Sequence, residues 1–126
     1  MLFEVTTRKD YATIDADLRA AVARHQFGVL GVHDLKQAMN NKGVDFDKEV
    51  FVYEVCNPHK AKAVLSANGA ISTALPCRIS VYRHGDEFRL ATMLPTAMMS
   101  AFGDEGLQAV AQEVETALVA IMNEAA

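Results

Sequence analysis

The most hydrophobic segment of the chain is an almost uninterrupted run of β-branched and aromatic residues from Val50 to Cys56. Such residues favour a pleated and largely buried strand. The run stops at Asn57 and Pro58, where Asn is a favoured N-cap and Pro fits the first helical position. We therefore expect a buried strand that ends where a helix begins, with Cys56 at the junction.

Helical periodicity appears at both ends of the chain. Apolar residues recur every three or four positions from near Asp10, and again from Asp104 or Glu105 almost to the C-terminus. Two shorter helices are expected, one capped by Asp34 and one that follows Pro58. The apolar stripes of the two longer helices are Ile14, Leu18, Ala21 and Val22, and Leu107, Val110, Ala111, Val114, Leu118, Ile121 and Met122.

The remaining apolar runs are typical of strands. In one of them, Gly28 and Gly31 indicate a bulge or a close approach by another backbone. The expected strands are a short one around residues 2–5, then 27–33, the run described above, 77–82 with alternating faces, and 87–93. A hairpin at His84-Gly85-Asp86 joins the last two. These elements predict a single α+β domain over residues 1–126, with a twisted sheet of four to five strands, mainly antiparallel or mixed, and helices packed on it.

In two segments, the apolar residues follow neither the helical nor the strand period. Residues 70–75 are interpreted as an irregular connection, and residues 93–102 as a methionine-rich loop. Methionine suits an adaptable contact surface. Met93, Met98, Met99 and Phe102 would then cover a hydrophobic ligand, a sister subunit or the protein's own core, and we favour the last.

Composition limits the number of domains, the classes of partner and the cellular location that we expect. Its 126 residues, 51% of them hydrophobic, suffice for one core. A net charge of −4 gives a nucleic-acid partner no electrostatic encouragement. The N-terminal residues do not resemble a secretory signal, and no apolar run reaches the ~18 residues of a membrane span. We therefore expect a cytoplasmic protein without a nucleic-acid or membrane partner, whose two cysteines remain thiols.

Two motifs link the chain to a known family. The segment Glu54-Val55-Cys56-Asn57-Pro58 with Ala61 and Leu65, and the later segment from Leu75-Pro76-Cys77-Arg78 to Tyr82, resemble the bacterial and archaeal family called domain of unknown function 302. The strand at Phe27-Gly28 after an amphipathic helix also resembles the family pattern. The resemblance implies a small α+β domain that forms a homodimer and has no established activity. Many members carry Gly at the position of Cys56, so a thiol role would belong to a subfamily.

Cys56 and Cys77 are the candidate catalytic residues, and Asn57, Arg78 and Glu54 are candidate ligand-binding residues. A helix N-terminus stabilises a thiolate and can hold an anion. Arg78 would add a fixed positive charge beside Cys77. If the two cysteine-bearing strands are antiparallel neighbours, both thiols share one sheet edge, and if they are parallel, the thiols lie at opposite edges. We slightly favour the first arrangement.

Other readings of these residues stay open. Both cysteines can be inert core residues, because free cysteine packs as a small hydrophobe. Glu54, inside an apolar run, would line a pocket near Cys56 or form an ion pair with Arg78 or Arg83, and we favour the ion pair. The spacing Cys56-x-x-His59 is a weak metal pattern that Cys77, His84 or His33 could complete. No cofactor is predicted, with a metal or haem as the alternative.

These candidates give three functional hypotheses. The first is a module that binds a small ligand or a sulfur-containing anion near Cys56, with a thiol or redox role. The second is a non-enzymatic dimeric interaction domain built on the methionine-rich segment and the final helix. The third is a metal or haem binder through cysteine and histidine. The sequence contains no motif that names a reaction, so whether the protein is an enzyme stays open.

Overall fold

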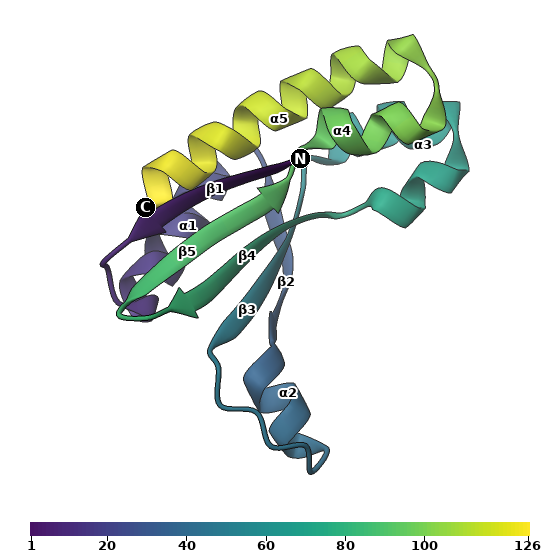
Figure 1. The fold of residues 1–126 in the computed structure, drawn as a ribbon. Coiled ribbons are helices and arrows are strands. Elements are labelled where there is room, and N and C mark those ends of the chain that lie inside the picture. The colour runs from purple at the N-terminus through teal and green to yellow at the C-terminus, as the bar shows by residue number, and fades with distance from the viewer.

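A computed structural model describes residues 1–126 as one five-stranded antiparallel sheet with helices on it, in the strand order β1-β5-β4-β3-β2. Figure 1 shows the twisted sheet, with the long helix α5 running above it. Each neighbouring pair of strands is antiparallel. The elements are β1 (Leu2–Thr7), α1 (Tyr11–Arg24), β2 (Gly28–Asp34), α2 (Leu35–Asn41), β3 (Val50–Cys56), α3 (Pro58–Ala67), the 3₁₀ helix η1 (Gly69–Ala74), β4 (Cys77–His84), β5 (Glu87–Met93), α4 (Pro95–Met99), the 3₁₀ helix η2 (Ser100–Phe102) and α5 (Glu105–Ala125).

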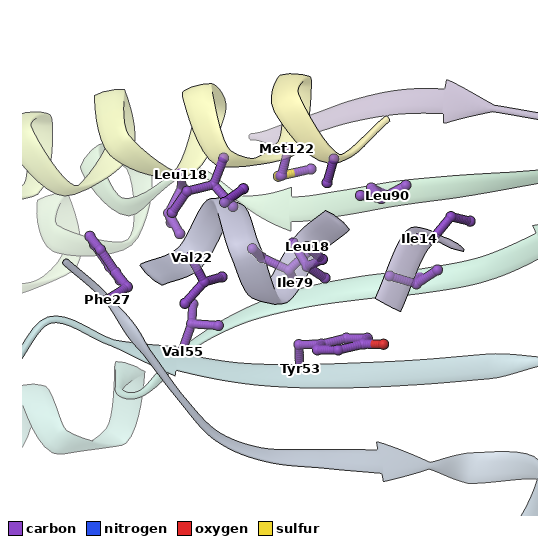
Figure 2. Packing of buried hydrophobic residues seen from close by; sticks show 14 of the residues in the cluster. Ile14, Leu18, Val22, Phe27, Tyr53, Val55, Ile79, Leu90, Leu118 and Met122 are labelled. Carbon is purple, nitrogen blue, oxygen red and sulfur yellow. The ribbon is translucent and has the colours of Figure 1, made fainter. Parts of the chain in front are cut away.

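The main core lies between the sheet and the helices α1 and α5, as Figure 2 shows. The apolar stripe of α1 is wholly buried, and α5 buries its C-terminal half against the same strands. Alternation along β3, β4 and β5 supplies the other side of this core. The fully buried members include Ile14, Leu18, Tyr53, Ile79, Leu90 and Leu118. The predicted α+β fold with a long C-terminal helix is thus confirmed.

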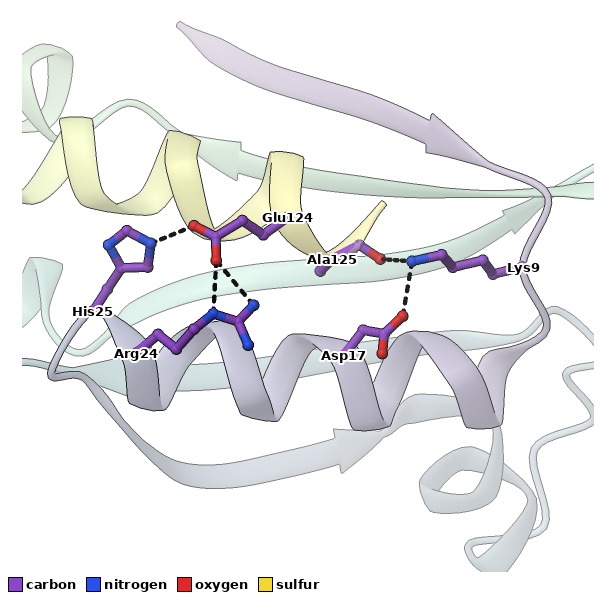
Figure 3. Close-up of polar contacts among 6 residues, drawn as sticks. All are labelled: Lys9, Asp17, Arg24, His25, Glu124 and Ala125. Atoms are coloured by element: carbon purple, nitrogen blue, oxygen red, sulfur yellow. Dashed lines mark hydrogen bonds and ion pairs between the residues drawn. The ribbon is translucent and has the colours of Figure 1, made fainter.

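Polar contacts fix the pairing of α1 with α5, as Figure 3 shows. Glu124 near the end of α5 accepts hydrogen bonds from Arg24 and pairs with His25 at 2.5 Å. The Lys9 ammonium bonds both Asp17 of α1 and the main-chain oxygen of Ala125. These contacts tie the C-terminal end of α1, and the segment just before α1, to the last turn of α5, so the helices dock in one register over the sheet.

The opposite face of the sheet presents polar residues that pair across strands. Glu4 of β1 accepts from the Tyr82 hydroxyl at 2.5 Å and lies 3.7 Å from the Arg89 guanidinium. Two apolar residues, Leu2 and its register partner Met93, are also exposed here, by 63% and 47%. This face therefore mixes ion pairs with an exposed apolar corner.

The local signals at the ends of the elements act as the sequence predicts. Asp10, Asp34, Asn57 and Asp104 each cap a helix by accepting a main-chain hydrogen bond. The register of β2 against β3 shifts between Val29 and Gly31, which is the expected irregularity. At Gly31, a Cβ would lie 3.6 Å from a Glu54 carboxylate oxygen, which is an ordinary contact distance, so the glycine marks the bulge and not a close approach by another backbone.

Two segments are more regular than the sequence predicted. Residues 69–74 form η1, with Asn68 as its cap, and residues 95–102 form α4 and η2 instead of a loop. Pro95 breaks β5 as expected, but it also stands in the first turn of α4. Ile71 of η1 and Met99 of α4 are buried in a second apolar cluster against α5. Tertiary burial, more than local propensity, thus accounts for these short helices.

The helix α2 extends away from the body of the molecule, and none of its residues is buried (Figure 1). No helix in the structure combines the length and apolar character that crossing a bilayer requires.

Candidate functional site

The candidate site is a cavity at the end of the sheet where β3 stops and β4 begins. The helices α3, α4 and α5 close it from the sides. Hydrophobic residues make up 13 of the 16 residues that line it. The enclosed volume of the cavity is about 40 Å³. The cavity is partly open to solvent, and with its open mouth the hollow measures about 500 Å³. The hollow has the apolar lining and the few polar groups of a small-molecule site, but its enclosed part is small, so a ligand would extend into the open mouth.

Both cysteines line this cavity. Val55 of β3 pairs with Cys77 of β4 in antiparallel register, so Cys56 follows the register partner of Cys77. The favoured expectation, that the two thiols share one sheet edge, therefore holds. Cys56 is half-buried, Cys77 is 7% exposed, and the two are not joined by a disulfide.

Burial keeps both thiols protonated. Desolvation raises the pKa of Cys56. Desolvation likewise raises the pKa of Cys77 to about 11, Cys56 adds to the rise, and Arg78 only partly opposes it. Loss of hydration therefore destabilises the thiolate more than the start of α3 stabilises it. The cavity presents neutral thiols at neutral pH.

Asn57 lines the cavity but its side chain serves the helix. Its amide oxygen accepts from the main-chain nitrogens of His59 and Lys60, and its main-chain oxygen accepts from Ala61. Pro58, at the first position of α3, has no N–H to offer. All of the first-turn donors of α3 are thus occupied or missing, so this helix start has no free amide for an anion.

Glu54 and Arg78 lie away from the cavity. They are register partners on β3 and β4, and the Arg78 guanidinium is 4.0 Å from the Glu54 carboxylate. The other Glu54 oxygen is 2.6 Å from the imidazole of His33 on β2. Neither residue is among those that line the cavity. The ion pair that we favoured for Glu54 is present, and neither Glu54 nor Arg78 joins Asn57 at the cavity.

The structure does not bring Cys56, His59 and Cys77 together as a metal site. His59 is exposed in the first turn of α3 and does not line the cavity with Cys56 and Cys77. No group of three or more His, Cys, Asp or Glu side chains has the geometry to hold a metal ion. A site of the zinc-finger type therefore has no donor set here.

The site residues chosen from the sequence did not include Met98, Met99 or Lys60, although the two methionines were expected to cover a hydrophobic ligand, a sister subunit or the core. Met98 and Met99 of α4 line the cavity, and Met99 is 5% exposed, so these methionines face inward and cover a hollow next to the core. Lys60 of α3 is the one charged side chain in the lining, and it pairs with Glu113 of α5. The methionine-rich composition was a usable signal for the first pair. Nothing in the local sequence distinguishes Lys60 from a solvated lysine.

The comparisons with known proteins agree with one another. A family model described as "Domain of unknown function DUF302" matches residues 3–125. A crystal structure of an uncharacterized conserved protein DUF302 from Bacillus stearothermophilus is similar, with 26% sequence identity and a TM-score of 0.94. The match covers 99% of this chain and 98% of that chain. A search of curated proteins finds no match.

Proposed function

The chain belongs to the family of domains of unknown function DUF302, and we propose that it is a binding module for a small, uncharged apolar ligand. The observation that carries the proposal is the cavity at the end of β3. Its walls are hydrophobic, it is partly open to solvent, and it includes both thiols of the chain. The hydrophobic effect supplies affinity for an apolar ligand there, in proportion to the area that leaves water.

The chemistry of the cavity favours an uncharged ligand over a sulfur-containing anion. The helix start offers no free amide, and Arg78 is engaged with Glu54 outside the cavity. An anion placed in the hollow would lose its hydration with only Lys60 to compensate, and Lys60 already has Glu113 as partner. The neutral thiols and Asn57 would instead orient a ligand by weak polar contacts.

A matched pair of variants tests the proposal. Ala61 lines the cavity on α3, whereas Ala63 on the same helix is exposed and lies outside the lining. Titration with benzene, followed by the NMR shifts of the Met98 and Met99 methyl groups, is expected to show saturable binding to the natural protein and to Ala63→Leu. Ala61→Leu fills the hollow and is expected to abolish binding. Absence of saturable binding to the natural protein, or equal binding by both variants, would overturn the proposal.

A specific surface feature supports a second function, that of a dimeric interaction domain. Leu2 and Met93 form an exposed apolar corner on the uncovered face of the sheet, next to Met1. Exposed apolar patches of this kind often mark protein contacts. We propose that this corner joins two copies of the chain. Sedimentation of the natural protein is expected to give a dimer that Met93→Glu converts to a monomer, and a monomeric natural protein would contradict the proposal.

We also propose that the protein is cytoplasmic. The two cysteines are free, as is usual for thiols in a reducing compartment. Fractionation of cells that express the full protein, with detection in the soluble fraction, tests this location.

A further inference from the structure

One side chain of the cavity carries a hydrogen-bond donor that no group of the protein uses. Asn57 lines the hollow, and its side-chain oxygen accepts from the main-chain nitrogens of His59 and Lys60. Its side-chain nitrogen, Nδ2, donates no hydrogen bond within the chain. Arg89 Nε is the only buried side-chain nitrogen or oxygen without a partner, so the unpaired Asn57 Nδ2 keeps access to solvent.

The cap of α3 fixes the direction of this donor. Two main-chain N–H groups require an acceptor, so the oxygen of the Asn57 amide faces them and Nδ2 does not. The two bonds, 3.0 and 3.2 Å long, hold the planar amide in place, and Nδ2 is fixed with it. A donor that is held before binding loses little conformational freedom when a ligand arrives. The residue that starts the helix therefore also provides a preorganised donor at the end of β3.

We propose that the ligand of the cavity is an apolar molecule with one uncharged acceptor oxygen, such as the carbonyl of a ketone or an ester, and that Asn57 Nδ2 donates to this oxygen. The inference rests on the proposed function, because it requires that the cavity admits an apolar ligand. The enclosed part of the hollow measures about 40 Å³, so it takes a hydrocarbon group while the rest of the ligand lies in the open mouth. Asn57 is half-buried, which suits the polar end of such a ligand.

The rest of the lining selects for an acceptor on the ligand and against a donor. No carboxylate, hydroxyl or imidazole side chain lines the cavity, and the Asn57 oxygen is already used by the cap. An amine or an amide N–H of the ligand would therefore meet no strong side-chain acceptor. Lys60 is paired with Glu113, and thiols are weak donors, so Asn57 is the best partner for a carbonyl oxygen.

The experiment compares two probes of nearly the same shape, acetophenone and ethylbenzene, which differ by a carbonyl in place of a methylene. The readout is the ratio of their affinities, because a change in the shape of the cavity affects both probes alike. Serine is also a favoured N-cap, so Asn57→Ser keeps the start of α3 and removes Nδ2. We expect this variant to bind ethylbenzene as the natural protein does. Its acetophenone-to-ethylbenzene ratio should be lower by about 5-fold, the equivalent of a net hydrogen bond of about 1 kcal/mol.

A second variant at the same position keeps the side-chain shape. Asn57→Asp retains the capping oxygen and replaces Nδ2 by a second acceptor, so the ratio should fall at least as far as in Asn57→Ser. In the natural protein, the Asn57 side-chain NH₂ resonances should shift on addition of acetophenone and stay in place with ethylbenzene. These resonances test the hydrogen bond directly, without any substitution.

Two further variants are matched controls. Asn68 caps η1 through a side-chain oxygen that accepts from Ala70, and it lies outside the cavity. Asn68→Ser should therefore leave the affinity ratio unchanged. Lys60→Met removes the other nitrogen donor of the lining and should also leave the ratio unchanged.

The outcomes distinguish this inference from the proposed function. If both probes bind and the ratio is the same in Asn57→Ser as in the natural protein, the role of Asn57 is wrong and the apolar cavity stands. A ratio that falls in Lys60→Met and not in Asn57→Ser would assign the carbonyl to Lys60 and overturn the inference. Saturable binding of neither probe to the natural protein would remove this inference and the proposed function together.

Discussion

The ionisation of Cys77 gives the sharpest test of the cavity. This thiol is 7% exposed, and burial raises its pKa to about 11. At pH 8 such a thiol is ionised in about one molecule in 1,000, whereas an unperturbed thiol with a pKa of about 8.5 is ionised in about one in four. The supply of thiolate is therefore lower by about 250-fold.

Two opposing effects modify that factor. A more basic thiolate is a better nucleophile, and with a Brønsted coefficient of about 0.4–0.5 a rise of about 2.5 pKa units returns roughly tenfold in reactivity. Ionisation and nucleophilicity together then predict alkylation about 20-fold slower than for an unstructured thiol. Burial of Cys77 restricts access and slows the reaction further.

The assay is alkylation by iodoacetamide across pH 7–11, with each thiol quantified by mass spectrometry. In a Cys56→Ser protein, the rate at Cys77 is expected to rise about tenfold per pH unit and to reach no plateau until about pH 11. The denatured protein provides the reference rate. A Cys77 rate within about twofold of this reference at pH 8, or a plateau below pH 9, would refute the account of a desolvated thiol.

The same shift has a consequence for stability. Below the unfolded-state pKa, Cys77 is protonated in both states and its burial carries no ionisation penalty. Above it, the unfolded thiol ionises while the folded thiol does not, so stability falls as the pH rises from about 9 to the folded pKa of about 11. The shift of about 2.5 units from the unperturbed value corresponds to about 3 kcal/mol. Urea unfolding at pH 8 and pH 11 should show this loss in the natural protein and less of it in Cys77→Ala.

Three further predictions concern residues outside the cavity. Hydrogen bonds from His25 and Arg24 lower the pKa of Glu124, so Glu124→Gln should lower the urea midpoint at pH 7. The difference between the two proteins should vanish as the pH falls through the folded pKa of Glu124. A difference that persists at pH 2 would contradict the ion-pair account. Tyr53→Phe removes a buried hydroxyl that donates to Asp15 at 2.6 Å. The free energy of unfolding should fall by about 2 kcal/mol, because a hydrogen bond to a charged group contributes about that much. A change below about 0.5 kcal/mol would argue against that bond. Arg78→Gln and Glu54→Gln should leave benzene binding unchanged, because both residues lie outside the cavity, and loss of binding in either variant would place the ligand elsewhere.

Local sequence signals determined most of the elements. The β-branched run before Asn57-Pro58 became β3 followed by α3, and the periodic C-terminal residues became α5. These signals are readable because caps and binary patterns act over a few residues, independently of the rest of the chain. The ion pair of Glu54 was also inferable, because a carboxylate in an apolar run needs a partner.

The tertiary structure alone decided what the candidate residues face. Cys77 and Arg78 are adjacent in sequence, yet Cys77 lines the cavity and Arg78 pairs with Glu54 outside it. Successive residues of a strand point to opposite faces, but which face receives helices depends on packing between distant segments. Met98 and Met99 likewise became cavity walls only when α4 packed on α5.

The sequence by itself therefore determined the fold class, the junction at Cys56 and the presence of two thiols, since each follows from residue types and local spacing. The apolar character of the site and the protonation of its thiols follow from desolvation. Desolvation is set by neighbours that α3, α4 and α5 bring from far along the chain. No local pattern around Cys56 or Cys77 encodes that environment, so only the assembled structure could reveal it.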